Sequence, residues 1–393
     1  MLKHKEHLDR KKIWFVNFTS FLLGFSDAIL LYITSTYFKL ASGMENVSIF
    51  YVLAYVTLLL VLLNLHKLTK KLGSVNIFLL ALFFKIIIIA FLAGLQPGFW
   101  GVFLLVLYVL LAGMEWVSLD ALLEGFSRDK ESGRIRGKHL TILNAGLLLG
   151  PFLSTRLLEH FGFFGVFFFL LVFNIFIFLL DLIKLRAVNN VFKKDISVSN
   201  LIKKILKRKN VLAIYYIALV LDFFYALMII YTPIYLFDLG LGWDKIGIIF
   251  TIMLLPFVFL QYPMGILADK KTGEKKLLLF ALCVMAFFTL ACYFTHSQEI
   301  VIWSIVLFGT RVGASMVEIL RDSYFYKRID GEDIDLIDFF RTAMPVGYIL
   351  AALISSLLLL FFPLKAIFIL LTVVIFSALV PAWRMVEIRP VKK

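Results

Sequence analysis

The chain has 393 residues, of which 62% are hydrophobic and only 17% are charged, and its mean hydropathy is +0.95. An average soluble domain is about 45–50% apolar and about 25% charged, so this composition excludes a soluble enzyme, a disulfide scaffold and a disordered tail. The net charge of +14 comes from basic residues in the links between apolar segments, without the interleaved basic and aromatic residues of a nucleic-acid site.

Apolar runs follow one another along the whole chain. A helix needs about 20 apolar residues to cross the hydrocarbon layer, and only helices or closed barrels satisfy their backbone polar groups there. The basic N-terminus leads into the first run without a small-residue cleavage site, which favours a retained span over a signal peptide. We therefore predict an all-α polytopic membrane protein with twelve transmembrane helices, within residues 13–39, 46–65, 74–95, 99–124, 138–160, 163–186, 211–237, 243–264, 275–295, 299–326, 335–361 and 363–385.

Lys and Arg are distributed unevenly between the links. They gather in the N-terminus and after the even-numbered runs, as in Lys67, Lys70 and Lys71 and in residues 203–209, whereas the opposite links hold few. Because basic links stay on the cytoplasmic side, this pattern predicts that both termini are cytoplasmic and that the protein resides in the cell (inner or plasma) membrane.

The longest link is basic and lies at the midpoint of the chain. It divides a predicted N-terminal six-helix bundle, residues 1–186, from a C-terminal six-helix bundle, residues 211–393, with residues 187–210 as a cytoplasmic linker. The halves resemble each other at an offset of about 200 residues, as expected for parallel repeats. The matched positions are Phe25, Ala28, Thr34 and Tyr37 with Phe223, Ala226, Thr232 and Tyr235, Asp120 with Asp322, and Gly146 with Gly347.

The link after the eighth run carries the most specific motif. It reads Gly-Ile-Leu-Ala-Asp-Lys-Lys-Thr-Gly-Glu-Lys-Lys from Gly265, with the acid at Asp269 and the second glycine at Gly273. Gly265 allows close helix approach, and Asp269 suits a neighbouring helix N-terminus. With the doubled six-span plan, this link resembles the loop signature of the major facilitator superfamily. The resemblance covers essentially the whole chain and implies a secondary transporter made of two pseudo-symmetric six-helix bundles.

The corresponding first-half link departs from that signature, because Lys70 stands at the place of the acid. The link that enters the eleventh run is unusually acidic. In the superfamily each loop signature faces the other half, so the resemblance implies that Lys67, Lys70 or Lys71 pairs with Asp333, Asp335 or Asp338. It likewise implies that Asp269 pairs with Arg134, Arg136 or Lys138. A solvated run of charges is the alternative interpretation.

The fifth run contains a close-packing face followed by a proline, at Gly146, Gly150 and Pro151. This stretch resembles the span-five signature of the superfamily's proton-coupled antiporters and favours export. The match is partial: Ser154 and Thr155 replace the closing glycines, and the fourth run lacks the antiporters' Arg before Gly113.

Several charged residues fall deep inside predicted spans, where each costs about 2.5–3.5 kcal/mol or more unless it meets a partner or water. They are Asp27, Glu115, Asp222, Arg311 and Glu318, with Lys85 at about the depth of Asp27. The resemblance implies that spans one, four, seven and ten line the transport cavity. We interpret the five residues as a substrate and proton pathway in which Asp27, Glu115 or Glu318 exchanges protons. Arg311 would tune a carboxylate or hold an anionic substrate group. An internally neutralised set that fixes helix register is the alternative.

These features together predict a non-enzymatic, monomeric transporter that moves a small organic solute by alternating access, coupled to protons, in a lipid bilayer. Cys283 and Cys292 share one apolar run, too few for a zinc or disulfide framework, so no metal or cofactor is predicted. One alternative is a membrane-embedded prenyl-type transferase that uses the acidic stretch Asp330 to Asp338. Another is a lipid-moving or receptor-like superfamily member with a degenerate site.

Overall fold

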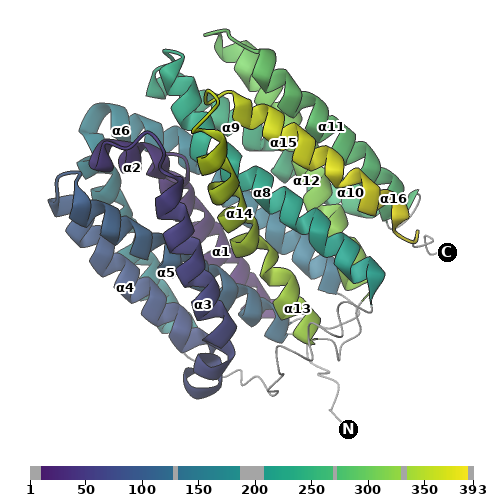
Figure 1. Ribbon diagram of the computed structural model, residues 1–393. Helices are drawn as coiled ribbons and strands as arrows, with labels where there is room; N and C mark the ends of the chain where they lie inside the picture. Colours follow the sequence, from purple (N-terminus) through teal and green to yellow (C-terminus); the bar gives the residue numbers. More distant parts are fainter. Residues whose placement is uncertain (1–9, 127–131, 186–207, 269–271, 329–333, 388–393) are drawn as a thin grey trace. The chain divides into compact units, whose positions relative to one another are not determined.

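The computed structural model describes residues 10–126, 132–185, 208–268, 272–328 and 334–387 (Figure 1). All regular secondary structure in these residues is helical, so the prediction of an all-α protein is confirmed. The chain forms two compact units. Unit 1 comprises Met1–Glu45 and Leu53–Lys194, and unit 2 comprises Asn46–Val52 and Asp195–Lys393.

Unit 1 is built from six helices, one of which contributes its first residues to unit 2. They are α1 (Arg10–Leu31), α2 (Thr34–Ser42), α3 (Ser48–Leu72), α4 (Ser74–Gly94), α5 (Phe99–Phe126) and α6 (Ser132–Lys184). The helix α6 contains two predicted spans, and it breaks between them at Gly162, where φ is 62° and ψ is −163°. A φ in the left-handed region suits glycine, which explains why the break falls at this residue.

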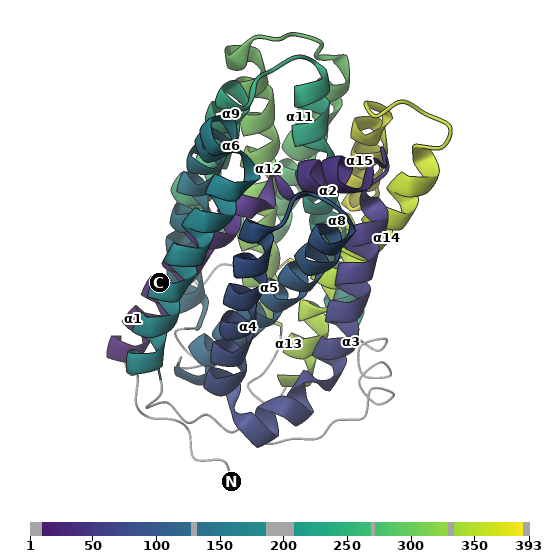
Figure 2. The ribbon, with the colours of Figure 1, turned by 90° about the vertical axis from the view of Figure 1, so that its left-hand side faces the viewer.

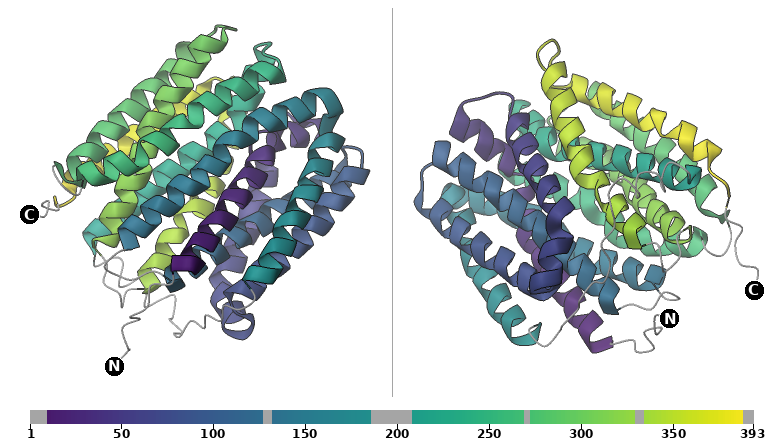
Figure 3. Two further views of the ribbon diagram at one scale, coloured as in Figure 1. Left: turned by 180° about the vertical axis from the view of Figure 1, so that it is seen from behind. Right: turned by 60° about the horizontal axis from the view of Figure 1, so that its bottom comes forward.

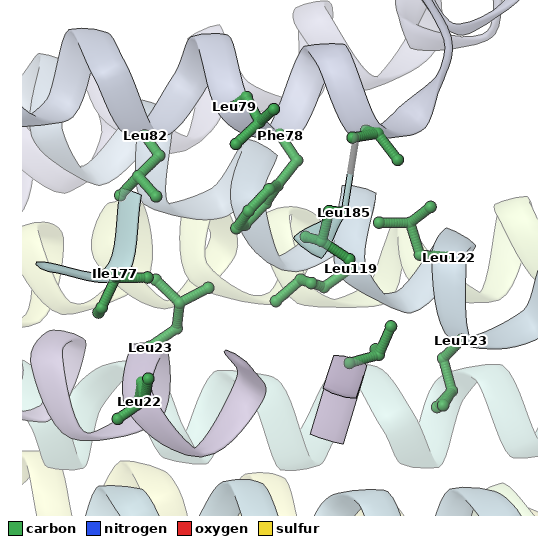
Figure 4. Packing of buried hydrophobic residues seen from close by; sticks show 12 residues of the cluster. Leu22, Leu23, Phe78, Leu79, Leu82, Leu119, Leu122, Leu123, Ile177 and Leu185 are labelled. Carbon is green, nitrogen blue, oxygen red and sulfur yellow. The ribbon is translucent and has the colours of Figure 1, made fainter. Parts of the chain in front are cut away.

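The helix α1 lies between the two arms of α6 (Figure 3, left). The first arm approaches α1 through small residues: a Cβ on Gly146 would lie 2.2 Å from the backbone oxygen of Phe21, and one on Gly150 would lie 2.2 Å from Cβ of Ala28. The second arm, together with α4 and α5, closes an apolar cluster around α1. Figure 4 shows Leu23 of α1 beside Ile177, with Phe78, Leu82 and Leu119 in the same cluster.

We expect Gly146→Ala to lower the stability of the protein by about 1–3 kcal/mol, because backbone atoms of α1 occupy the space of the added methyl group. Gly94→Ala is a matched control. Apart from the neighbouring backbone of its own helix, no atom lies within 4 Å of a Cβ placed on Gly94. Thermal unfolding of the purified protein in detergent checks both variants. Equal melting temperatures for the two would contradict the tight packing of α1 on α6.

Unit 2 repeats this plan with more interrupted helices. They are α8 (Lys209–Asp238), α9 (Trp243–Phe259), α10 (Gln261–Leu267), α11 (Glu274–Phe294), α12 (Ile300–Tyr326), α13 (Ile334–Arg341), α14 (Ala343–Leu358), α15 (Ala366–Ser377) and α16 (Leu379–Arg384). α8 packs against α14, and α11 packs against α12 (Figure 1). The helix α9 ends three residues after Pro256, and α10 continues the same predicted span from Gln261.

Two contacts recur at equivalent positions of the units. A Cβ on Gly146 would lie 3.1 Å from the backbone nitrogen of Phe25, and one on Gly347 would lie 3.1 Å from that of Phe223. Likewise, the ring of Tyr37 packs edge-on against Phe167 at 5.6 Å, and that of Tyr235 packs edge-on against Phe368 at 5.3 Å. The sequence repeat therefore corresponds to a repeat of helix packing.

Ten helices in the described residues are long and apolar enough to cross a membrane, by length and composition. One of them, Lys138–Lys184, has 47 residues and includes the break at Gly162, and the apolar stretch Ser48–Leu62 forms an additional shorter helix. Each of the twelve predicted segments thus contains helix, as can be followed in Figures 1 and 2. The number of membrane crossings remains a prediction.

Candidate functional site

A buried lysine lies between two carboxylates in unit 1. Lys85 of α4 places its Nζ 2.5 Å from Oε2 of Glu115 on α5 and 3.3 Å from Oδ1 of Asp27 on α1. The side chains of Lys85 and Glu115 are fully buried, and that of Asp27 is 11% exposed. Three helices therefore bring their deep charges to one point, which we call the Lys85 cluster.

The two acids of this cluster have different surroundings. Asp27 accepts additional hydrogen bonds from the hydroxyl of Tyr108, at 3.2 Å, and from Nε1 of Trp116, at 2.7 Å. Glu115 has Lys85 as its hydrogen-bond donor, and its second oxygen, Oε1, is buried without a partner among the described residues. Three donors suit an ionised Asp27, whereas the dry oxygen of Glu115 suits a protonated carboxyl.

Asp181 is a buried acid that the sequence analysis missed. It lies near the end of α6, where its Oδ1 accepts a hydrogen bond of 2.6 Å from Thr19 of α1, and its Oδ2 has no partner among the described residues. Seven residues before it, Asn174 donates to Ser26 of α1 at 2.8 Å. Residues seven apart lie on the same face of a helix, so the spacing of Asn174 and Asp181 could have predicted a polar face there from the sequence.

In unit 2, Glu318 and Arg311 of α12 both contact Tyr225 of α8. Glu318 Oε2 accepts hydrogen bonds from Nε2 of Gln261, at 2.9 Å, and from the hydroxyl of Tyr225, at 3.4 Å. The Arg311 guanidinium lies 5.8 Å from the ring centre of Tyr225 and 5.0 Å from that of Phe224. The structure thus brings Glu318 and Arg311 to one aromatic residue.

The remaining predicted residue, Asp222 of α8, lies in an ion-paired group. Its Oδ2 is 3.3 Å from Nη1 of Arg321, whose Nε is 3.3 Å from Oδ1 of Asp322. Arg321 also donates to the backbone oxygen of Ala218 at 3.3 Å. Because Arg321 supplies a cation to both acids, this arrangement fits the alternative of a neutralised set that fixes the register of α8 and α12.

The two sites use equivalent positions of the repeat, but the acid and its hydrogen-bond donor have exchanged helices. In unit 1 the acid is Asp27 on the first helix, and the donor is Trp116 on α5. At the equivalent level of unit 2 the donor is Tyr225 on α8, and the acid is Glu318 on α12. Each unit therefore links its first helix to its fourth span through hydrogen bonds to a carboxylate, from Tyr108 and Trp116 in unit 1 and from Tyr225 in unit 2.

Comparison with known proteins identifies the family. The model of the Major Facilitator Superfamily matches residues 16–329 and 246–393. The chain belongs to the major facilitator superfamily. The crystal structure of a mutant of the nucleoside transporter NupG is similar in fold, with a TM-score of 0.72 and 12% sequence identity, over 95% of this chain and 99% of that one. No curated protein matches this sequence.

Family membership and the many apolar helices make this chain an integral membrane protein with the fold of the superfamily's transporters. The predicted resemblance is thereby confirmed. Proteins of this superfamily are secondary transporters of small molecules. Asp27, Glu115, Arg311 and Glu318 lie in spans that the resemblance assigned to the pathway, whereas Lys85 lies in the third predicted span.

The superfamily loop signature is only partly described by the structure. Gly265 lies in α10, Gly273 precedes α11 with a φ of 76°, and Asp269 lies outside the described residues. The next residue, Glu274, is buried and accepts from Ser323 of α12 at 2.9 Å and from Lys327, which directly follows α12, at 2.5 Å. Glu274 thus fastens the start of α11 to α12, a role that sequence analysis did not assign.

The predicted loop pairings stay predictions. Lys71 at the end of α3 is exposed, Lys70 lies in the same helix, Arg136 lies in α6, and Asp335 and Asp338 lie in α13. The first acids of the stretch proposed for a transferase, Asp330 to Asp333, fall outside the described residues. Within the residues that are described, no group of three or more His, Cys, Asp or Glu side chains could hold a metal ion.

Proposed function

We propose that this protein is a proton-coupled secondary transporter of a small organic solute, and that Glu115 carries the coupling proton. The observation that supports this proposal most strongly is one buried lysine between two carboxylates, of which Glu115 is fully buried and Asp27 is 11% exposed. With all three groups ionised, the Lys85 cluster would hold an uncompensated negative charge in the membrane interior, where isolated charges are costly. One proton on a carboxyl removes that charge.

The placement of this proton follows from the hydrogen bonds. Asp27 accepts hydrogen bonds from three donors, which stabilise its ionised form. Oε1 of Glu115 is buried and has no hydrogen-bond partner among the described groups. Proton release from Glu115 would therefore need water or a rearranged Lys85. Alternating access supplies such a change, because a cavity that opens to one side admits water and alters the relative energies of the two states.

The remaining features of the proposal follow from the sequence. The chain would cross the cell membrane twelve times as a monomer, with cytoplasmic termini and with residues 187–210 joining two six-helix halves. Export is the proposed direction, since Gly146, Gly150 and Pro151 resemble the first part of the antiporter signature in span five. We assign the transport pathway to Asp27, Glu115, Arg311 and Glu318, and we assign Asp222 to structural pairing with Arg321.

The proposed function is tested with the purified protein in liposomes. A thermal-shift screen against solute libraries first selects a bound solute, because ligands that bind the folded state raise its apparent stability. An imposed gradient of one pH unit should then drive about tenfold accumulation of that solute, if one proton moves for each solute. Solute movement that ignores the pH gradient would contradict proton coupling. Binding without any movement would favour a receptor-like protein.

Asp181→Asn provides a further check on the assignment of the proton. We expect pH-driven transport to remain within about threefold of wild type. The neutral asparagine side chain retains an oxygen that can accept the hydrogen bond from Thr19. Transport by this variant is compared with the wild type in the same liposomes. A loss as large as that of Glu115→Gln would place the coupling proton on Asp181 instead.

A further inference from the structure

Arg311 is a buried cation without a counter-ion in the described part of unit 2. Its side chain is 2% exposed, and its Nη1 is buried with no hydrogen-bond partner among the described groups. A guanidinium keeps its positive charge in proteins, so it does not escape the cost of burial by losing a proton. Its contacts with the rings of Phe224 and Tyr225 offset part of that cost and leave hydrogen-bond donors unused.

The nearby acids of unit 2 are engaged elsewhere. Glu318, seven residues along α12, accepts from Gln261 and Tyr225. Asp222 lies in an ion pair with Arg321, whose Nε is within ion-pair distance of Asp322. No described carboxylate lies within ion-pair distance of Arg311. A negatively charged group from outside the described residues would complete this site.

We propose, on the basis of the proposed transport function, that Arg311 recognises a carboxylate of the transported solute, so that the solute class is an organic monocarboxylate. The planar fork of a guanidinium matches the two oxygens of a carboxylate. A single negative charge also balances the single charge of Arg311. A doubly charged phosphate would leave excess charge in surroundings formed by aromatic rings.

The aromatic contacts define how the site is held in position. Phe224 and Tyr225 are consecutive residues of α8, and both rings face the guanidinium, at 5.0 and 5.8 Å from ring centre to Cζ. The hydroxyl of Tyr225 is at the same time held by Glu318. The orientation of Arg311 is therefore fixed before an anion arrives, which lowers the entropy cost of binding.

Ligand binding to the purified full-length protein in detergent tests the proposal. The probes are benzoate and hexanoate, their neutral amides benzamide and hexanamide, and chloride and phosphate, all at one ionic strength and followed by thermal shift. We expect the carboxylates to stabilise the wild type and the amides to have no effect. Arg311→Gln should weaken carboxylate binding about 30-fold or more, and Arg311→Lys should be intermediate, since it keeps the charge and loses the fork.

Arg156→Gln is the matched control, because Arg156 is exposed on α6 and stacks on Phe152 at 5.5 Å. It should bind the carboxylates as the wild type does. In the absence of ligand, Arg311→Met should melt at a higher temperature than the wild type, because it removes a buried charge that has no counter-ion among the described residues. Lower stability of both Arg311→Gln and Arg311→Met would assign Arg311 a structural role and overturn the proposal.

Three further results would overturn the proposal: stabilisation by carboxylates in Arg311→Gln equal to that in the wild type, stabilisation by the amides, or no stabilisation by either carboxylate. Stabilisation by chloride or phosphate alone would show an inorganic anion site and overturn the solute class. These measurements need no pH gradient. A negative binding result therefore does not contradict proton coupling at the Lys85 cluster. A negative result in the pH-gradient experiment likewise does not contradict carboxylate binding at Arg311.

Discussion

Lys85→Met is expected to abolish transport and to lower the stability of the protein by about 3–5 kcal/mol at neutral pH. The substitution removes the cation from between two acids, Glu115 and Asp27, whose side chains are 0% and 11% exposed. Both carboxyls must then bind protons to remain neutral in the folded protein. Because the folded state would hold more protons than the unfolded state, the stability of this variant should fall as pH rises. Thermal unfolding across a pH series measures the effect.

The double variant Lys85→Met with Glu115→Gln separates charge from packing. It leaves Asp27 as the one acid that needs a proton, so we expect it to be more stable than Lys85→Met alone. Leu82→Ala is the control for packing, because Leu82 is a fully buried apolar residue of α4 in the same unit. Its loss of stability should not depend on pH. A pH-independent loss in Lys85→Met as well would contradict the charge account.

Asp27→Asn and Glu115→Gln are each expected to uncouple transport from protons. Either change leaves one lysine with one acid, which is neutral without a bound proton. Under a gradient of one pH unit, accumulation of the solute should fall from about tenfold to no accumulation. Exchange of labelled for unlabelled solute needs no net proton movement, so it should persist in both variants.

Glu318→Gln provides the comparison for these two variants. Glu318 accepts from Gln261 and Tyr225, and no described lysine forms an ion pair with it. It therefore does not belong to a group of one cation and two acids that needs a proton to become neutral. Because Glu318 belongs to the proposed pathway, we expect Glu318→Gln to slow transport, but we expect the solute to reach the same accumulation under the pH gradient. Accumulation lost in that variant and kept in Glu115→Gln would move the coupling proton to unit 2.

Most of the helical plan could be predicted from the sequence, because a membrane-spanning helix requires a long apolar run. The separate spans on either side of Gly162 were predicted for this reason, although the structure keeps them in one broken helix. Pro256 marked a kink inside its apolar run, but the residues at which helices end inside such runs were not predicted. The turn between α1 and α2 near Ile33 and the division of α9 from α10 at Leu260 lie within continuous apolar sequence, so hydropathy gives no sign of them.

The candidate site was predictable as a set of residues but not as a set of contacts. Deep charges such as Asp27 and Glu115 are conspicuous in an apolar helix, and helical periodicity assigns each to a face. Periodicity does not say which faces of different helices meet. The position of Lys85 between the two acids, and the pairing of Asp222 with Arg321, depend on helix packing and needed coordinates.

A count of protonated carboxyl groups by infrared difference spectroscopy tests the central claim most directly. The band of a protonated carboxyl is compared at neutral pH between wild type and variants. Asp181, a buried acid present in all of them, contributes equally to each spectrum and drops out of the difference. The account predicts that Glu115→Gln has one protonated carboxyl fewer than the wild type and that Lys85→Met has one more. Identical carboxyl bands in wild type and Glu115→Gln would show that the Lys85 cluster holds no proton, and would contradict the account.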